Sequence, residues 1–224
     1  MELSVDFPSR IGNQLVRGKV DLGLVPVAVL PRMKEFFIQG SYCIGATAAV
    51  ASVCIFSERP IQELRTLYLD YQSFSSVTLA RYLLRDYWGL DLNLLPAEPG
   101  YEERLTGESG GVVIGDRALQ LRSRYPYCYD LAEVWIRHQG LPFVFAAWIS
   151  NKPLDPGFVR DFDEATGYGT QGPGLEEVLR EQTCTYYDLR TYYTQNISYP
   201  LDEAKHKGLD RFQRIMTEQL KLGA

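Results

Sequence analysis

Histidine and cysteine are scarce in this sequence. Among 224 residues there are two histidines and four cysteines, and the cysteines, Cys43, Cys54, Cys128 and Cys184, form no C-x-x-C pair. A protein-bound zinc ion or iron–sulfur cluster needs closely spaced thiolate or imidazole ligands. We therefore expect no metal site, and we interpret the cysteines as reduced, mostly buried thiols of a cytoplasmic protein.

Long apolar runs and clusters of basic residues are absent as well. No segment reaches the ~18 uninterrupted apolar residues that a membrane-spanning helix needs. The formal net charge is −5 and Lys and Arg are dispersed, whereas a surface for nucleic acid or an anionic membrane needs them clustered. The start, MELSVDFPSR, lacks the basic and apolar stretches of a secretion signal. We predict a cytoplasmic protein that binds neither nucleic acid nor membrane.

The sequence also lacks several motifs that carry their own chemistry. It contains no Walker phosphate-binding loop, no G-x-G-x-x-G, no G-x-S-x-G and no H-E-x-x-H. These motifs are typical of nucleotide binding, serine hydrolysis and zinc proteolysis. None of those functions is therefore indicated.

Apolar segments that alternate with amphipathic ones are the main pattern that is present. The expected strands are VDLGLVPV ending at Pro26, LRTLYLDY (64–71), LNLLPAEP, residues 111–114 and PFVFAAWIS. Apolar residues at helical spacing predict helices over residues 11–16, VTLARYLLRDYWGL and YDLAEVWIRHQGLPF. Strands this apolar are typical of a parallel or mixed sheet covered on both faces, so the predicted class is α/β.

The last third of the sequence, from Lys152, is expected to be mainly helical. Leu209, Phe212, Met216 and Leu220 follow helical spacing near the end. The glycines of TGYGTQGPG (166–174) predict a mobile connection. The tyrosines that precede the last helix are expected to pack against the C-terminal helices; they are Tyr186, Tyr187, Tyr192, Tyr193 and Tyr199.

Small and hydroxyl-bearing residues occupy the joints between strands and helices. Ligands of open α/β sheets bind at the carboxyl ends of strands, where helix N-termini present free N–H groups. The serines of DYQSFSS fit such a joint, although one of them could simply cap the helix while the others face water. The spacing of Asp116 favours a helix cap, and His138 is expected to be structural. GATAAVAS (45–52) permits close approach of backbone or substrate, but its hydroxyls, Thr47 and Ser52, could equally bond to local backbone. The joints together suit a small anion.

Several of these segments also resemble a known family. VDLGLVPVAVLP, VASVCIFS, LDYQSFSSVTLARYLL, VVIGDRAL and YDLAEVWIRHQGLPFVFAAW resemble, in matching order, the MqnA family of menaquinone biosynthesis, as does the tail ISYPLDEAKHKGLDRF. The resemblance implies the two-lobed fold of type II periplasmic binding proteins, with mixed sheets and a helical C-terminal part. Residues 1–57 and 149–224 would form the first lobe and residues 58–148 the second, with VASVCIFS and PFVFAAW as the crossing strands.

The family resemblance also implies an activity and a site. It implies chorismate dehydratase, a hydro-lyase that converts chorismate into 3-[(1-carboxyvinyl)oxy]benzoate in the futalosine pathway. The substrate is a small dicarboxylate, no cofactor is required, and the protein would be a monomer or homodimer. Ser52 matches the catalytic serine of a V-x-S motif. The cleft between the lobes would collect the substrate-binding residues, which are Thr47, Ala48, Ala49, Ser73, Ser75, Ser76, Gly115 and Asp116.

Differences from the family pattern leave alternatives open. Family members usually begin with a strand that ends in Y/F-L-N-x-x-P, and its asparagine belongs to the active site. This sequence opens at the second strand, so we expect that segment to be missing and Met1 to be an internal methionine of a truncated chain. Ala48-Ala49 replaces the family's G-P. The alternatives are a small-carboxylate binding module without catalysis and the related naphthoate synthase of the same pathway.

Overall fold

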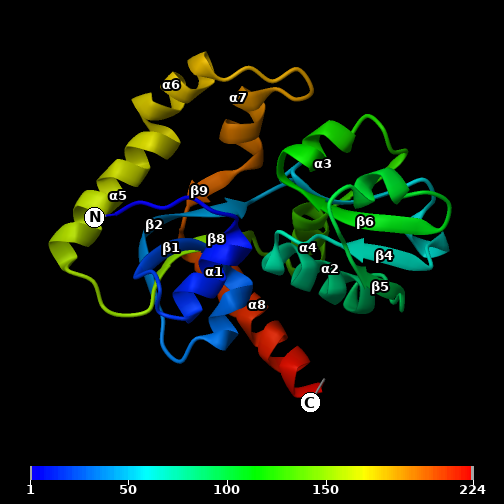
Figure 1. Ribbon diagram of the computed structural model, residues 1–224, viewed down its shortest axis with the longest axis horizontal. Coiled ribbons are helices and arrows are strands. Elements are labelled where there is room, and N and C mark those ends of the chain that lie inside the picture. The colour runs from blue at the N-terminus through cyan, green and yellow to red at the C-terminus, as the bar shows by residue number, and fades with distance from the viewer. Residues whose placement is uncertain (1, 223–224) are drawn as a thin grey trace. The chain divides into compact units, whose positions relative to one another are not determined.

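The computed structural model describes residues 2–222, with side chains of the last helix described as far as residue 218. Met1 and the side chain of Leu220 lie outside the described residues, so what rests on them stays a prediction. The chain forms two compact units (Figure 1). The first contains the chain up to Gly45, Val144–Thr183 and the part from Tyr199 onward, and the second contains Ala46–Phe143 and Cys184–Ser198.

The first unit is built on a four-stranded sheet in the order β1-β8-β2-β9. Its strands are β1 (Leu22–Pro26), β2 (Phe37–Ala46), β8 (Phe143–Ser150) and β9 (Ser198–Pro200), and its helices are α1 (Pro8–Val16), α5 (Pro156–Gln171), α6 (Pro173–Glu181) and α8 (Glu203–Leu222), with a 3₁₀ helix η1 at Val27–Arg32. β1 and β8 are antiparallel, with Leu22 opposite Ser150. Both were predicted as strands, and β8 is largely buried, as its apolar sequence indicates. Leu209, Phe212 and Met216 of α8 are buried as expected.

The segment TGYGTQGPG is helical, so the prediction of a mobile connection was wrong. α5 continues through Gln171 and α6 starts directly after Gly172. Gly167 lies against Tyr42 of β2, where a Cβ would come within 2.6 Å of the phenol oxygen. Glycine serves close packing here rather than chain flexibility.

The second unit is built on a five-stranded sheet in the order β5-β4-β6-β3-β7. Its strands are β3 (Val53–Ser57), β4 (Thr66–Leu69), β5 (Asn93–Pro96), β6 (Ser109–Ile114) and β7 (Tyr127–Asp130), and its helical segments are α2 (Phe74–Asp86), α3 (Gly115–Leu121), α4 (Leu131–Gln139), α7 (Leu189–Thr191), the π-helix η4 (Tyr192–Asn196) and the 3₁₀ helices η2 (Ile61–Glu63) and η3 (Tyr101–Arg104). β4 is parallel to β5 and β6, whereas β3 is antiparallel to β6 and β7. The sheet is therefore mixed, which confirms the predicted class. β7 was missed, because its last residues lie in a segment predicted as the start of a helix.

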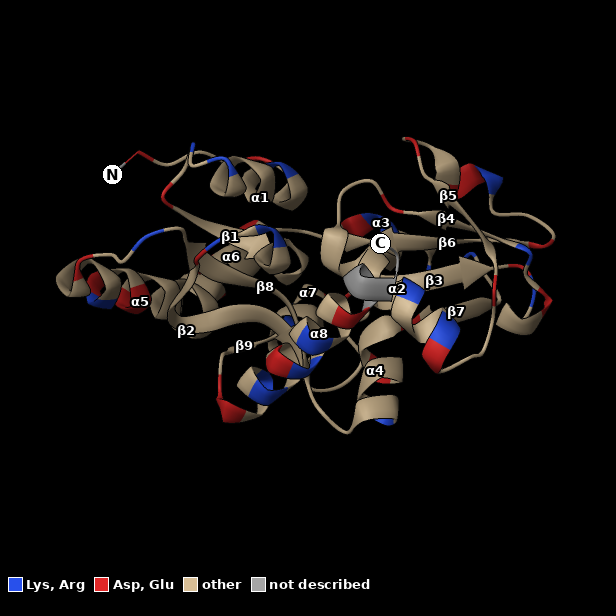
Figure 2. Cartoon of the chain, turned by 90° about the horizontal axis from the view of Figure 1, so that it is seen from below, with Lys and Arg blue, Asp and Glu red and all other residues tan. Residues whose placement is uncertain are grey.

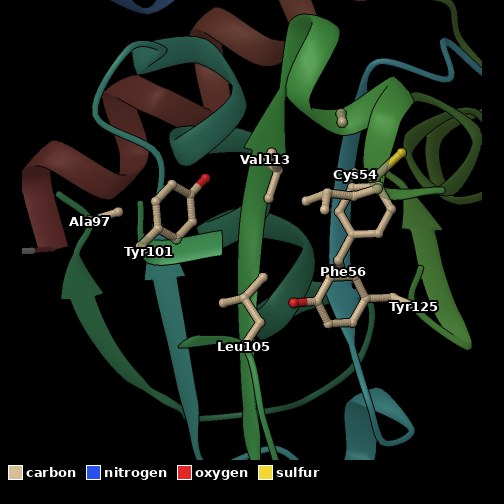
Figure 3. Packing of buried hydrophobic residues seen from close by; sticks show 9 residues of the cluster. Cys54, Phe56, Ala97, Tyr101, Leu105, Val113 and Tyr125 are labelled. Carbon is tan, nitrogen blue, oxygen red and sulfur yellow. The ribbon is translucent and has the colours of Figure 1, made fainter. Parts of the chain in front are cut away.

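A buried cluster covers one face of this sheet (Figure 3). Phe56 of β3 and Val113 of β6 contribute to it, with Tyr101 and Leu105 from the connection before β6. The ring of Tyr125 packs on that of Phe56, with 6.0 Å between centroids. Burial of such side chains contributes roughly 1.5–3 kcal/mol each, so this cluster stabilises the sheet that carries the joints.

The boundaries between the units differ from those expected for the lobes. The chain leaves the first unit after Gly45 rather than after residue 57, so β3 belongs to the second unit. It returns at Val144, five residues before the predicted 149. The segment Cys184–Ser198 then rejoins the second unit, which the sequence did not predict. The physical reason is that β3 pairs along its length with β6 and β7.

Charges of both signs are mixed along the helices. Figure 2 shows acidic and basic residues close together on α5 and on α8. Within residues 2–222, no helix is long and apolar enough to cross a membrane. In the same part of the chain, His, Cys, Asp and Glu side chains form no group of three or more that could hold a metal ion.

Candidate functional site

Strand direction brings several joints of the second unit to one edge of its sheet. β4 and β6 are parallel, so their carboxyl ends, which lead to α2 and α3, share that edge. β3 is antiparallel to β6 and to β7, so its amino end at Ser52 and the carboxyl end of β7 at Asp130 lie there too. Helix N-termini carry unpaired N–H groups and the positive end of the helix dipole. This edge is the candidate site.

Ser52 is held by its own backbone at the start of β3. Its N–H donates to the carbonyl of Val50 and its carbonyl accepts from the N–H of Gly115, both at 2.8 Å. Ala51 has φ +65°, in the left-handed region, which costs a residue with a Cβ about 1–2 kcal/mol. Strain of this kind persists only where neighbouring bonds fix the backbone. Ser52 is buried, with 4% of the residue exposed.

The carboxylate of Asp130 supplies one of those bonds. Its Oδ2 accepts from the N–H of Ala51 at 2.7 Å, and its Oδ1 caps α4 by accepting from Ala132 and Glu133, each at 3.1 Å. The guanidinium of Arg122 donates to the carbonyl of Ala51 at 3.1 Å. Burial raises the pKa of Asp130, and the N–H donors oppose that shift. Asp130 therefore joins the start of α4 to the strained turn before Ser52.

Tyr192 and Asn196 were not predicted as site residues, yet both contact the loop that contains Ser52. The phenol of Tyr192 donates to Oγ of Ser52 at 2.9 Å, and Nδ2 of Asn196 donates to the carbonyl of Ala49 at 3.0 Å. Tyr187 donates to Oδ1 of Asn196 at 2.9 Å. Tyr187 packs on the π-helix that contains Tyr192 and Asn196, as expected, with its ring 6.2 Å from that of Tyr192, but the hydrogen bond from Tyr192 to Ser52 was not foreseen. Only their place just before the tail segment ISYPLDEAKHKGLDRF connects them with the family resemblance.

The phenol of Tyr192 is in a protected environment. Burial raises its pKa to about 12, the charges of Asp116 and of neighbouring tyrosines act in the same direction, and the hydrogen bond to Ser52 opposes them. The ring packs on Tyr193, with centroids 5.2 Å apart. Tyr192 is consequently protonated near neutral pH and can act as a hydrogen-bond donor.

Among the serines of DYQSFSS, Ser73 is the N-cap of α2. Its Oγ accepts from the N–H of Ser76 at 3.2 Å, and the two hydroxyls are 2.8 Å apart. Ser75 and Ser76 are 1% and 2% exposed, so they do not face water. β6 separates β4 from β3. The Ser73–Ser76 turn therefore shares the edge with Ser52 but is not next to it.

A buried ion-pair network stabilises the joint after β4. Arg117 of α3 pairs with Asp70 at 2.6 Å, pairs with Glu102 and donates to Oε1 of Gln72 at 3.0 Å. Tyr101 donates to Asp70 at 2.9 Å. Burial raises the pKa of Asp70, whereas the Gln72 N–H and Arg117 lower it. Arg117 thus ties α3 to this joint, and its charge is already balanced by carboxylates.

The joint after β6 contains Gly115 and Asp116. Gly115 has φ +64°, and its N–H reaches the carbonyl of Ser52. The N-cap of α3 is Ile114, with no side-chain cap bond, so the prediction that Asp116 is the cap was wrong. Asp116 is exposed in the first turn of α3, where its negative charge interacts favourably with the positive end of the helix dipole.

The remaining predicted residues lie on the loop before β3. Thr47 and Ala48 are exposed, and Ala49 is half-buried. Of the predicted residues, Gly115 bonds directly to Ser52, and Ala49 is joined to it through Asn196 and Tyr192 of the same π-helix. His138 lies in the last turn of α4, at the other end of the helix from Asp130. Its Nε2 is 3.1 Å from the hydroxyl of Tyr82. That position agrees with the expected structural role of His138.

Two thiols share Arg122 with the turn before Ser52. Cys54 of β3 and Cys128 of β7 both contact Nη1 of Arg122, at 3.5 and 3.8 Å. The hydrogen bond from Cys54 and the charge of Arg122 lower the pKa of Cys128, whereas the same bond and burial raise the pKa of Cys54. All four cysteines are free thiols, as predicted, with Cys43 and Cys54 buried and the other two half-buried.

Solved structures place this fold among the periplasmic binding proteins. A structural-genomics protein of Archaeoglobus fulgidus superposes with a TM-score of 0.72 at 10% identity, covering 99% of this chain and 87% of that one. An ABC transporter protein of Parabacteroides distasonis gives 0.61 at 17% identity, covering 96% and 80%. The periplasmic aliphatic sulphonate binding protein of Escherichia coli gives 0.58 at 12%, covering 96% and 78%. The chain has a periplasmic-binding-protein-like α/β fold.

Sequence comparisons narrow the assignment from a fold to a family. A family model described as menaquinone biosynthesis matches residues 1–218, and the chain belongs to that family. A chorismate dehydratase of Thermus thermophilus is 26% identical over 93% of this chain and 84% of its own length. A chorismate dehydratase of Campylobacter jejuni is 25% identical over 95% and 82%. The family resemblance inferred from the sequence motifs is confirmed.

Proposed function

We propose that this protein is a hydro-lyase that removes water from chorismate to give 3-[(1-carboxyvinyl)oxy]benzoate. Membership of the menaquinone biosynthesis family and the two chorismate dehydratase relatives support this reaction. The structural observation that carries the proposal is the fixed hydroxyl of Ser52 at a sheet edge where helices begin.

The reaction removes a ring proton from C3 and the hydroxyl group from C4, and these leave together as one water molecule while the ring becomes aromatic. Negative charge that develops as the C3 proton departs spreads to the ring carboxylate. Hydrogen-bond donors placed at that carboxylate or at the departing hydroxyl would stabilise the transition state. The proton acceptor would be the substrate's own enolpyruvyl carboxylate, which would pass the proton on to the departing C4 hydroxyl so that water leaves, with the protein supplying the geometry.

Within this proposal, Ser52 donates a hydrogen bond to the substrate or to its departing hydroxyl. The first turn of α2, with Ser73, Ser75 and Ser76, would hold a carboxylate at a helix N-terminus. Residues of the Thr47–Ala49 loop and the Gly115-Asp116 joint would complete the contacts. Balanced charge on Arg117 is consistent with a site that binds anions through hydroxyl and N–H groups rather than through a free cation.

Incubation with chorismate tests the proposal directly. Purified protein should form the aromatic product, which chromatography with mass detection follows. Ser52→Ala should lower turnover roughly 100-fold, as expected for loss of a transition-state donor. Ser57→Ala is the matched control, because Ser57 is fully buried at the other end of β3 and donates to the carbonyl of Arg59 at 2.7 Å.

Each result separates the alternatives. Wild-type turnover in Ser52→Ala would show that Ser52 has no part in the reaction. Chorismate binding without product, measured by calorimetry on the wild type, would favour the small-carboxylate binding module. Equal losses in Ser52→Ala and Ser57→Ala would indicate damage to β3 rather than loss of a catalytic group.

A further inference from the structure

The segment Cys184–Ser198 brings a second hydroxyl to Ser52. Tyr192 and Asn196, four residues apart on one π-helix, bond to the two ends of the Ala49–Ser52 loop. π-Helical turns are rare and occur frequently at functional sites. Asn196 uses its amide nitrogen on Ala49 and its amide oxygen on Tyr187, so its side chain anchors the segment.

The direction of the hydrogen bond between Tyr192 and Ser52 follows from acidity. A phenol is far more acidic than an aliphatic alcohol, so Tyr192 is the better donor and Oγ of Ser52 the better acceptor. Since a serine hydroxyl has a single hydrogen, a Ser52 that accepts from Tyr192 keeps this hydrogen for another partner. A hydroxyl that accepts a hydrogen bond also becomes a stronger donor.

We propose that Tyr192 is a positioning residue for the reaction: its phenol orients and polarises Ser52 so that Ser52 donates a hydrogen bond to the departing hydroxyl of the substrate. This inference rests on the proposed function. The competing arrangement is that Tyr192 covers Ser52 only in the free protein and that substrate must displace it. The two arrangements predict opposite effects when the phenol oxygen is removed.

The test compares Tyr192→Phe, Ser52→Ala and the double variant with chorismate as substrate. Tyr192→Phe should lower kcat about 3- to 10-fold, the range for one neutral hydrogen bond, with KM nearly unchanged. In the Ser52→Ala background the same substitution should cause no further loss, because Tyr192 acts through Ser52. Tyr82→Phe is the matched control. It removes a tyrosine hydroxyl that accepts from Gln139 in the same unit and does not bond to the Ala49–Ser52 loop.

The outcomes distinguish this inference from the proposed function. If the wild type converts chorismate and Tyr192→Phe has an equal or higher kcat, or a lower KM, only the positioning role is overturned. Losses that multiply in the double variant also overturn it, because Tyr192 would then act independently of Ser52. A wild type that neither binds nor converts chorismate overturns both. Urea unfolding of Tyr192→Phe, expected to show one cooperative transition close to that of wild type, shows whether the variant is folded when it is assayed.

Discussion

The carboxylate of Asp130 accepts a hydrogen bond of 2.7 Å from the N–H of Ala51, although 79 positions separate the two residues in the sequence. Ala51 is in the left-handed region and directly precedes Ser52. One buried carboxylate thus fixes both the first turn of α4 and the backbone that orients Ser52. This relationship makes Asp130 a sensitive position for both stability and turnover.

Asp130→Asn should destabilise the protein by about 2 kcal/mol, because an amide can accept with only one atom and one buried N–H would face an NH₂ group. Turnover of chorismate should fall as the Ala51 turn relaxes. Urea unfolding and the product assay measure the two effects. Asp155→Asn is the control, since Asp155 is an exposed N-cap of α5 whose side chain accepts one hydrogen bond, from the N–H of Phe158. Asparagine is also a good cap, so the control should lose less than about 1 kcal/mol. Equal effects in the two variants would contradict the role of Asp130.

Gly115→Ala and Gly89→Ala form a matched pair. Both glycines have φ +64°, and a Cβ at either position would meet nothing within 4 Å. Each substitution should therefore cost about 1–2 kcal/mol from backbone strain alone. Alanine keeps the N–H, but relief of the strain at position 115 would shift the N–H that donates to the carbonyl of Ser52, so only Gly115→Ala should lower turnover. Denaturation curves check that the two variants lose equal stability, and the product assay checks that only Gly115→Ala loses turnover. A turnover loss in Gly89→Ala of the same size would show that stability, not the Ser52 contact, limits activity.

Cys128 should react with iodoacetamide at neutral pH before the other thiols. The Cys54 hydrogen bond and Arg122 lower its pKa, while burial raises the pKa of Cys43 to about 12. The thiolate is the reactive form, so a lower pKa speeds alkylation. Peptide mass spectrometry after timed quenching gives the order of modification. Cys184 is the control for accessibility because it is also half-buried.

Arg122→Met should slow the alkylation of Cys128 and leave that of Cys184 unchanged. An unchanged rate at Cys128 would show that the guanidinium does not stabilise its thiolate. Faster modification of Cys184 than of Cys128 in the wild type would show that exposure, rather than pKa, decides the order.

Local sequence patterns predicted most of the regular elements. The strands that became β1, β5, β6 and β8 were recognisable from apolar runs ended by proline or polar residues; for β6 and β8, which are mostly buried, burial on both faces demands such composition. The helices α1, α2 and α4 followed from apolar residues at helical spacing. Where glycine packs closely, as at Gly167, the same composition was misread as a flexible connection, because a sequence does not show what lies against a glycine.

The joints of the candidate site were also foreseeable in part. Ser52, Ser73 and Gly115 stand out because hydroxyl and small residues follow or precede apolar strands. The backbone geometry of each helix start decided the caps. Ser73 caps α2, whereas Asp116 does not cap α3. A pattern of residue types fixes the neighbourhood of a cap to within a few positions but not the hydrogen bond itself.

The sequence by itself determined the α/β class, the family and the identity of the small, hydroxyl-bearing joints. Only the tertiary structure decided that β3 joins the second unit, that Asp130 holds Ala51, and that Tyr192 reaches Ser52 across 140 positions of sequence. The physical reason is that periodicity and composition indicate whether a side chain is buried. Which residue it packs against depends on strand pairing and on contacts between segments that lie far apart in the sequence.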